Sequence, residues 1–150
     1  QIISMVTNTE DFMVDAPSAA ICRFSDGGRL GVLEYTHAKE MPMRSKYYPN
    51  DEFFEIHGAQ GSILVTRCSG EMLDMPPVML ITGTETTSYQ VPMDWIEGFN
   101  GSAANFIDSI LDNKQPDMDA DFSRKVLQVA FSIYKSSELQ RPIDPNTLQD

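Results

Sequence analysis

The chain of 150 residues carries 22 acidic and 11 basic side chains, a formal net charge of −11, and 41% of its residues are hydrophobic. This length fits about one domain, since domains usually take roughly 100–200 residues, and the composition can build a core without disulfides. So acidic a chain repels phosphate backbones and anionic lipids, which argues against nucleic acid and membranes as partners.

Other features of the sequence favour the cytoplasm. Cys22 and Cys68 lie in strand-like runs and not as a spaced pair, which predicts small buried hydrophobes in a reducing compartment; a disulfide is the alternative. No signal peptide is recognisable, and no apolar run reaches the ~18 residues that span a bilayer. The chain starts at Gln1 and enters an apolar run at once, so we expect a piece of a longer protein.

The first part of the chain, up to about Pro92, predicts strands joined by tight turns. A first strand is expected around Val6, and "AAICRF" and "LGVLEYTH" flank the turn "SDGG". The runs "FFEIHG" and "GSILVTRC" follow, and then "PPVMLITG" and "TTSYQVP" around Gly83.

Helical spacing of apolar residues begins after "DWIEGFNG". We expect a first helix capped by Asn100 or Ser102, a break at "NKQPD", and a second helix from about Asp121 to Leu139. The capping candidates for the second helix are Asp119, Asp121 and Ser123. Its apolar arc is wider than one stripe, which predicts cover on more than one side.

Strands followed by helices predict an α+β fold. We expect one domain over residues 1–150, with an open, largely antiparallel (mixed) sheet of about six strands and two C-terminal helices packed on one face. Apolar side chains are expected on both faces of the strands, since Phe54 and Ile56 point to one side and Phe53 to the other. A half-solvated sheet would show a polar outer face, so the open face needs a cover. A homo-oligomer with two-fold contacts is the expected one, and cover by a preceding domain of the longer protein is the alternative.

The two glycines of "FFEIHGAQGSILVTRC" raise the question of a phosphate-binding loop. Such a loop needs a helix after the glycine turn, whose N–H groups face the phosphates. The residues after Gly61 have the character of a strand, so "GAQG" is expected to be a hairpin turn. No cofactor-binding residue is therefore assigned in this chain.

Catalytic and metal sites find little support in the sequence. His37 and His57 are the only histidines, and neither lies in a zinc-binding pattern, so we interpret both as solvated or hydrogen-bonded strand residues. No serine lies in a nucleophile elbow. The acidic residues Asp117, Asp119 and Asp121 fit helix capping better than calcium binding. The sequence thus assigns no catalytic and no metal-binding residue.

One loop is a candidate substrate site. "KEMPMRSKYYPNDE" gathers Arg44, Lys46, Tyr47 and Tyr48 in an otherwise acidic chain. Arginine suits carboxylate or hydroxyl-rich ligands, and tyrosine offers a stacking face and a hydroxyl. We predict substrate contacts from Arg44, Tyr47 and Tyr48; an ordinary basic loop is the alternative.

Two segments of the chain follow each other in a familiar order, namely "EIHGAQGSILV" and "NFIDSILDNKQPDMDADFSRKVLQVAFSIYKSSELQRPI". This order resembles the C-terminal domain of the Gfo/Idh/MocA oxidoreductases, the glucose–fructose oxidoreductase and inositol dehydrogenase family. The similarity runs from about Ala19 to Ile143. The positions that match the family pattern are Phe106, Ile110, Pro116, Val126, Leu127, Ile133, Tyr134, Ser136, Ser137, Arg141 and Pro142.

The resemblance implies an oxidoreductase that uses NAD or NADP on a sugar, cyclitol or related polyol. It also implies that the N-terminal Rossmann domain and the family's catalytic Lys, Asp and His lie outside this chain, which would supply substrate contacts and a subunit interface through packed sheets. Whether this chain belongs to an enzyme stays open. The alternative is a stand-alone, non-catalytic ligand-binding or assembly module, because fold analogy does not fix chemistry.

Overall fold

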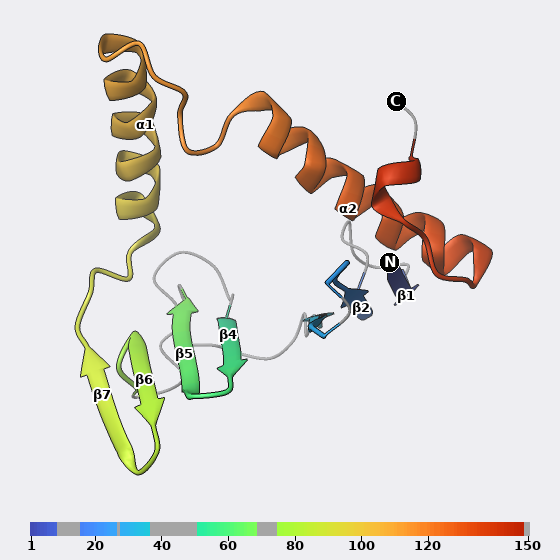
Figure 1. The fold of residues 1–150 in the computed structure, drawn as a ribbon, viewed down its shortest axis with the longest axis horizontal. Coiled ribbons are helices and arrows are strands. Elements are labelled where there is room, and N and C mark those ends of the chain that lie inside the picture. The colour runs from blue at the N-terminus through green and yellow to red at the C-terminus, as the bar shows by residue number, and fades with distance from the viewer. Residues whose placement is uncertain (9–15, 27, 37–50, 69–74, 149–150) are drawn as a thin grey trace. The chain divides into compact units, whose positions relative to one another are not determined.

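The computed structural model describes residues 1–8, 16–26, 28–36, 51–68 and 75–148, without the side chains of residues 51, 67 and 68 (Figure 1). The chain divides into two compact units, unit 1 with Gln1–Lys39 and Asp117–Asp150 and unit 2 with Glu40–Pro116. The described residues form seven strands and two α-helices, which confirms the predicted α+β class. In chain order, the elements are β1 (Ile2–Val6), β2 (Ser18–Arg23), β3 (Leu30–Tyr35), β4 (Asp51–Gly58), β5 (Gly61–Cys68), β6 (Val78–Thr82), β7 (Glu85–Tyr89), α1 (Trp95–Leu111), α2 (Ala120–Leu139) and the short 3₁₀ helix η1 (Pro145–Thr147).

Unit 1 combines a three-stranded antiparallel sheet, in the order β1-β2-β3, with α2 and η1. The turn that includes "SDGG" joins β2 to β3, as the sequence predicts, and Arg23 pairs with Leu30 where the two strands leave the turn. Alternate residues of the sheet are buried, notably Ile2 and Ala20, at 3% exposure each. Helix α2 packs against β1, so this buried face is the one that carries the core of unit 1.

The outer edge of β1 is closed by the C-terminal part of the chain. The backbone N–H of Ile2 donates to the carbonyl of Ile143 (2.7 Å), that of Ser4 to Ser136 Oγ (3.1 Å), and that of Val6 to Ser137 Oγ (2.9 Å). In a strand, the backbone N–H groups of successive residues point alternately toward its two edges. The N–H groups of every second residue, Ile2, Ser4 and Val6, therefore face away from β2. Serine hydroxyls of α2 therefore take the place of a neighbouring strand, and this edge is not open to another chain.

Unit 2 contains a four-stranded antiparallel meander in the order β4-β5-β6-β7. Gly58 pairs with Gly61 across the turn Ala59–Gln60, which confirms that "GAQG" connects two strands and does not lead into a helix. Gly61 is required by packing, since a Cβ there would collide with the carbonyl oxygen of Ile81 on the neighbouring strand. Gly83, in the turn between β6 and β7, has a φ of +59°, a conformation that favours glycine.

Both helices begin at an aspartate. The carboxylate of Asp119 accepts the N–H of Phe122 (2.8 Å), which confirms one of the predicted caps of α2. Helix α1 begins at Trp95 behind Asp94, whose carboxylate accepts the N–H of Ile96 (3.1 Å). The predicted start at Asn100 or Ser102 was therefore wrong by more than one turn, because Asp94 caps the helix earlier.

The number and grouping of the strands also differ from the prediction of one sheet with about six. The described strands form two sheets, of three and four strands, and the two helices belong to different units. The physical reason is that turn signals specify which neighbouring strands pair, whereas the joining of separate sheets depends on contacts far apart in the sequence.

Candidate functional site

The predicted substrate residues Arg44, Tyr47 and Tyr48 lie outside the described residues, as do Lys46 and His37. The structure places β3 before this segment and β4 after it, so the loop connects an element of one sheet to an element of the other. The assignment of substrate contacts to these residues stays a prediction.

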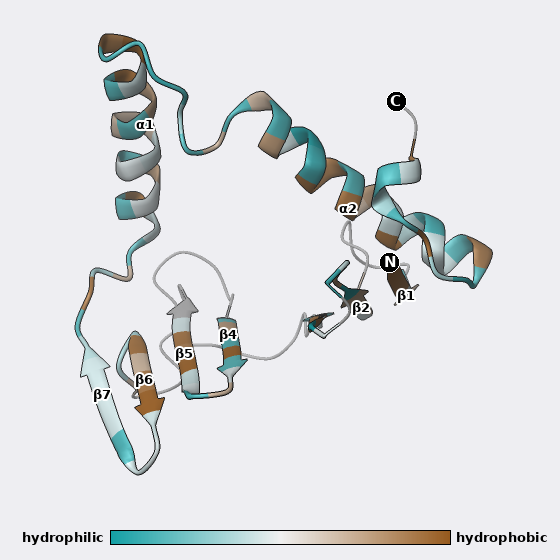
Figure 2. Cartoon of the chain, viewed as in Figure 1, coloured by the Kyte–Doolittle hydropathy of each residue, from teal (hydrophilic) through white to brown (hydrophobic). Residues whose placement is uncertain are grey.

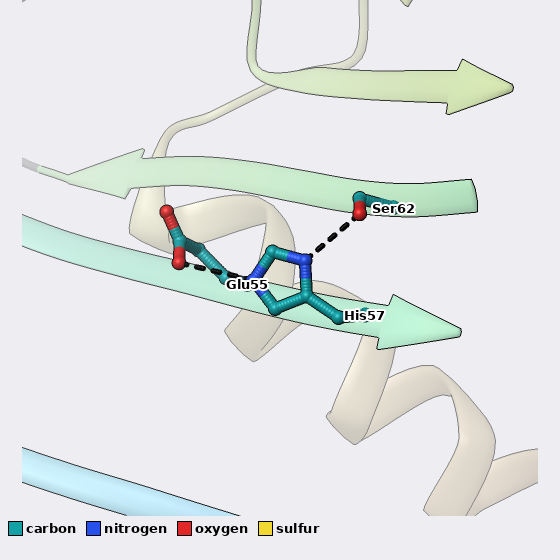
Figure 3. A network of polar contacts seen from close by, with 3 residues as sticks. All are labelled: Glu55, His57 and Ser62. Carbon is teal, nitrogen blue, oxygen red and sulfur yellow. Dashed lines mark hydrogen bonds and ion pairs between the residues drawn. The ribbon is translucent and has the colours of Figure 1, made fainter. Parts of the chain in front are cut away.

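A polar cluster of Glu55, His57 and Ser62 lies on one face of the β4–β5 hairpin (Figure 3). His57 Nδ1 is 2.8 Å from Ser62 Oγ, and His57 Nε2 is 3.3 Å from Glu55 Oε2. Glu55 and His57 are two residues apart on β4, and Ser62 is the cross-strand partner of His57. The hairpin register alone brings the three side chains together. The turn "GAQG" sets this register, and side chains alternate between the two faces of a strand, so these two signals could have found the cluster from the sequence.

The cluster has the residue types of a hydrolase triad but not its surroundings. The side chains of His57 and Glu55 are 64% and 50% exposed, so water competes for their hydrogen bonds. Nucleophilic catalysis also needs oriented donors for the developing oxyanion, which a flat strand face does not present. We interpret the cluster as a stabilising cross-strand contact, which agrees with the prediction that His57 is a hydrogen-bonded strand residue.

Three ionisable groups among the described residues have displaced pKa values, and each has a local cause. A hydrogen bond from the Arg29 side chain lowers the pKa of Asp26. The backbone N–H of Asn146 lowers that of Asp144, whose Oδ1 it reaches at 3.0 Å. Burial raises the pKa of the free Cys22 thiol. The two aspartates are exposed, one at a turn and one at the start of η1, so these shifts reflect local capping and not an enclosed reaction site.

Two kinds of site were also sought among the described residues. No group of three or more His, Cys, Asp or Glu side chains there could hold a metal ion. Neither described α-helix has the length and apolar character needed to cross a bilayer.

The most extended feature of unit 2 is an apolar sheet face. The antiparallel registers align Phe54, Val65, Val78 and Tyr89 in one row across the four strands. Ile56, Ile63 and Leu80 form the next row, and Figure 2 shows β6 as largely hydrophobic. The opposite face carries the polar cluster and Thr86 and Ser88 of β7 together with Leu64, Met79 and Ile81. In the sequence, apolar residues occupy positions on both sides of these strands. The strand pairing shows that one face of this sheet is apolar and that the other is mixed.

Much of this apolar surface is solvent-exposed. Phe54 is 51% and Ile56 60% exposed. Helix α1 adds a stripe at helical spacing whose members are equally exposed, namely Ile96, Phe99, Phe106 and Ile110. Apolar faces of this extent are rare on monomeric proteins and mark interaction surfaces.

Unit 1 has an exposed apolar face of its own. The registers align Ile3, Ile21 and Val32 in a row across β1, β2 and β3, on the side of the sheet opposite Ile2 and Ala20. The three side chains of this row are 46%, 47% and 72% exposed. Helix α2 packs against β1 on the Ile2 and Ala20 side of the sheet, whereas Leu33 and Tyr35 of β3 on that same side are 53% and 42% exposed.

A scan against models of known protein families matches none of them to this chain, and a search of curated proteins finds no significant match. The resemblance to the Gfo/Idh/MocA oxidoreductases therefore rests on the sequence pattern.

Proposed function

We propose that this chain is the C-terminal domain of a longer NAD(P)-dependent oxidoreductase that acts on a sugar, cyclitol or related polyol. In this proposal it contributes substrate contacts and a subunit interface in a cytoplasmic homo-oligomer. The family-like order of "EIHGAQGSILV" and the two helices that follow supports the family. The exposed apolar face of the β4–β7 sheet is the observation that carries the role of an interaction domain.

The chemistry divides between two parts of the proposed protein. A Rossmann domain would bind NAD or NADP and supply the catalytic groups for hydride transfer. This chain would add the loop with Arg44, Tyr47 and Tyr48. An arginine fork and phenolic hydroxyls can hydrogen-bond several hydroxyls of a polyol at once, which orients the carbon that is oxidised toward the cofactor.

The oxidoreductase proposal is tested on the protein from the complete reading frame. We expect NAD(P)-dependent turnover of at least one member of a panel of sugars and cyclitols, and a loss of at least about tenfold in kcat/KM for Arg44→Ala, or ~1.4 kcal/mol. Lys125→Ala is the control, because Lys125 lies on α2 and carries the same charge. A reading frame without a dinucleotide-binding glycine turn, or a protein without cofactor binding, would favour the stand-alone module instead.

The subunit interface is tested separately through the apolar rows of β4–β7. Ile56 is 60% exposed, so Ile56→Glu should leave the fold of unit 2 intact but place a charge on the apolar face of the proposed contact, on the edge strand β4. We expect light scattering after size exclusion to show a discrete dimer or tetramer for the unmodified chain and a smaller species for this variant. A monomer at ~50 μM in the unmodified chain would contradict the interface, because interfaces of the obligate class persist at that concentration.

A further inference from the structure

Helix α1 contains a chemically reactive pair of residues, Asn100 followed by Gly101. Of the asparagines in the chain, only Asn100 precedes a glycine. The side-chain amide of an asparagine is open to attack by the backbone nitrogen of the next residue. Glycine permits the close approach best, because it has no Cβ and its backbone adopts conformations that other residues avoid. The sequence therefore places a self-modifying pair inside a helix.

The helical conformation holds the two reacting atoms apart. In an α-helix the N–H of Gly101 donates to the carbonyl of Glu97, and the helical backbone of Asn100 directs that nitrogen away from its own side-chain carbon. The reaction therefore requires the first two turns of α1 to open. These turns are weak, because Gly98 and Gly101 are poor helix formers, and the cap at Asp94 opposes their opening. Helix ends open at a much smaller free-energy cost than the whole fold.

We propose that Asn100 is a site of spontaneous deamidation whose rate is set by the opening of the N-terminal turns of α1. The Gly101 nitrogen forms a bond to Cγ of Asn100, the bond from Cγ to the side-chain nitrogen breaks, and ammonia leaves with the proton of the Gly101 N–H. Water then opens the cyclic imide at either of its carbonyls. One opening gives aspartate, and the other gives isoaspartate, in which the main chain runs through Cβ and Cγ. The reaction consumes water and needs no oxidant or reductant.

The modification would change the apolar stripe of α1. Ile96 lies four residues before Asn100 and Ile107 seven residues after it, and these spacings belong to one face of a helix. Either product places a carboxylate on this face, which is unfavourable in any apolar contact. Isoaspartate also lengthens the main chain and interrupts the hydrogen-bond ladder, which separates Ile96 and Phe99 from the rest of the stripe. This consequence involves one helix, so it depends neither on the arrangement of the units nor on the oxidoreductase proposal.

The test follows the intact chain during storage at neutral pH and body temperature. Samples are digested at mildly acidic pH, which prevents conversion during preparation, and are analysed by mass spectrometry. Asn100→Asp supplies the standard for the aspartate product, and a protein isoaspartate methyltransferase with S-adenosylmethionine labels the isoaspartate. We expect progressive conversion of Asn100. Asn105 and Asn113, which precede a phenylalanine and a lysine, should remain amides in the same samples.

Two variants change the stability of the opening turns without altering the reacting pair. Asp94→Ala removes the cap and should speed conversion about fivefold. Gly98→Ala strengthens the helix and should slow conversion by about the same factor. Gly101→Ala hinders the attack itself and should slow it at least about tenfold, and a Cβ there meets nothing within 4 Å. Gly58→Ala, in the turn between β4 and β5, is the matched control and should leave the rate unchanged.

Circular dichroism confirms that each variant is folded, and the chain unfolded in guanidinium gives the rate without the helix. We expect the unfolded chain to convert fastest, followed by Asp94→Ala, the unmodified chain and Gly98→Ala. The proposal is overturned if Asn100 converts no faster than Asn105, if the folded and unfolded chains convert equally fast, or if neither Asp94→Ala nor Gly98→Ala changes the rate. None of these measurements involves the cofactor, so they are independent of the dehydrogenase assay.

Discussion

The backbone N–H of Ser4 donates a hydrogen bond to Ser136 Oγ over 3.1 Å, between residues 132 positions apart. The same hydroxyl donates to the carbonyl of Arg141 (2.9 Å), and Ser136 itself is fully buried. One side chain therefore satisfies a strand edge and the segment that follows α2. Ser136 and Arg141 belong to the positions that carry the family resemblance, so the structure gives these two residues a structural role.

Ser136→Ala should lower the free energy of unfolding by about 1–2 kcal/mol, because it leaves a buried N–H and a carbonyl without a partner. Ser132→Ala is the matched control. Ser132 is equally buried, but its hydroxyl donates to the carbonyl of Gln128 (2.7 Å), which the helix already bonds. Urea unfolding of both variants measures the difference, and equal losses would argue against the special role of Ser136.

Gly61→Ala should destabilise unit 2 by about 1–3 kcal/mol, the usual cost of overpacking, since the new Cβ would collide with the Ile81 carbonyl. Gly58→Ala, at the other end of the same turn, should cost much less. There the nearest atom to a new Cβ is the Gly61 carbonyl oxygen at 3.6 Å, an ordinary contact. Thermal unfolding of the two variants tests the prediction, and a reversed order of melting temperatures would refute it.

Asp119→Ala should cost about 1 kcal/mol, the usual effect of losing an N-cap, because the N–H of Phe122 loses its acceptor. Asp119→Asn should retain most of the stability, since asparagine caps equally well. Chemical denaturation monitored by circular dichroism compares the two. If asparagine were as damaging as alanine, the negative charge and not the hydrogen bond would be the important property.

Arg29→Met should raise the pKa of Asp26 toward the ordinary aspartate value, because the Arg29 side chain is the main cause of its lowering. A carboxylate whose pKa is lowered in the folded state contributes stability above its unfolded pKa, and this contribution is lost as the pH falls through the folded value. The variant should therefore lose less stability on acidification. NMR titration of Asp26 gives the pKa, and Arg124→Met, which removes a guanidinium near Asp121, should leave it unchanged.

The Cys22 thiol should react slowly with a thiol reagent at neutral pH, because burial raises its pKa and leaves less thiolate. In a Cys68→Ser background, we expect the rate to be at least about tenfold below that of the urea-unfolded chain. A rate equal to the unfolded one would show that the thiol is not protected. Mass spectrometry of the untreated, unmodified chain tests the accompanying prediction that no Cys22–Cys68 bridge forms.

Local signals in the sequence predicted much of the fold. The β4–β5 hairpin followed from Gly58 and Gly61 between β-branched runs, and α2 followed from Asp119 before an apolar arc. The start of α1 was missed because Gly98 and Asn100 are weak helix formers that suggested a loop. Ile96 and Phe99 nevertheless continue the apolar stripe of α1 toward its N-terminus, and this periodicity was the better guide.

Contacts between distant segments could not be predicted. Ser136 and Ser137 look like surface residues in the sequence, since nothing local indicates that β1 lies alongside α2. The same holds for the exposed row of Ile3, Ile21 and Val32 in unit 1, which emerges only from the strand register. Of the candidate sites, the hydrogen-bonded role of His57 was predicted, whereas its partners Glu55 and Ser62 required the register. The substrate role of Arg44, Tyr47 and Tyr48 stays a prediction.

The closure of the β1 edge has a consequence for biosynthesis. Strand β1 is translated before unit 2, and its partners Ser136, Ser137 and Ile143 are translated more than a hundred residues after it. At about 5–20 residues per second, the ribosome needs roughly 7 to 28 seconds to pass from Ile2 to Ile143. Unit 2, which is continuous in sequence, is complete before then. We therefore expect unit 2 to fold first on the nascent chain, while β1 exposes an unpaired edge that is a natural target for chaperones until α2 emerges.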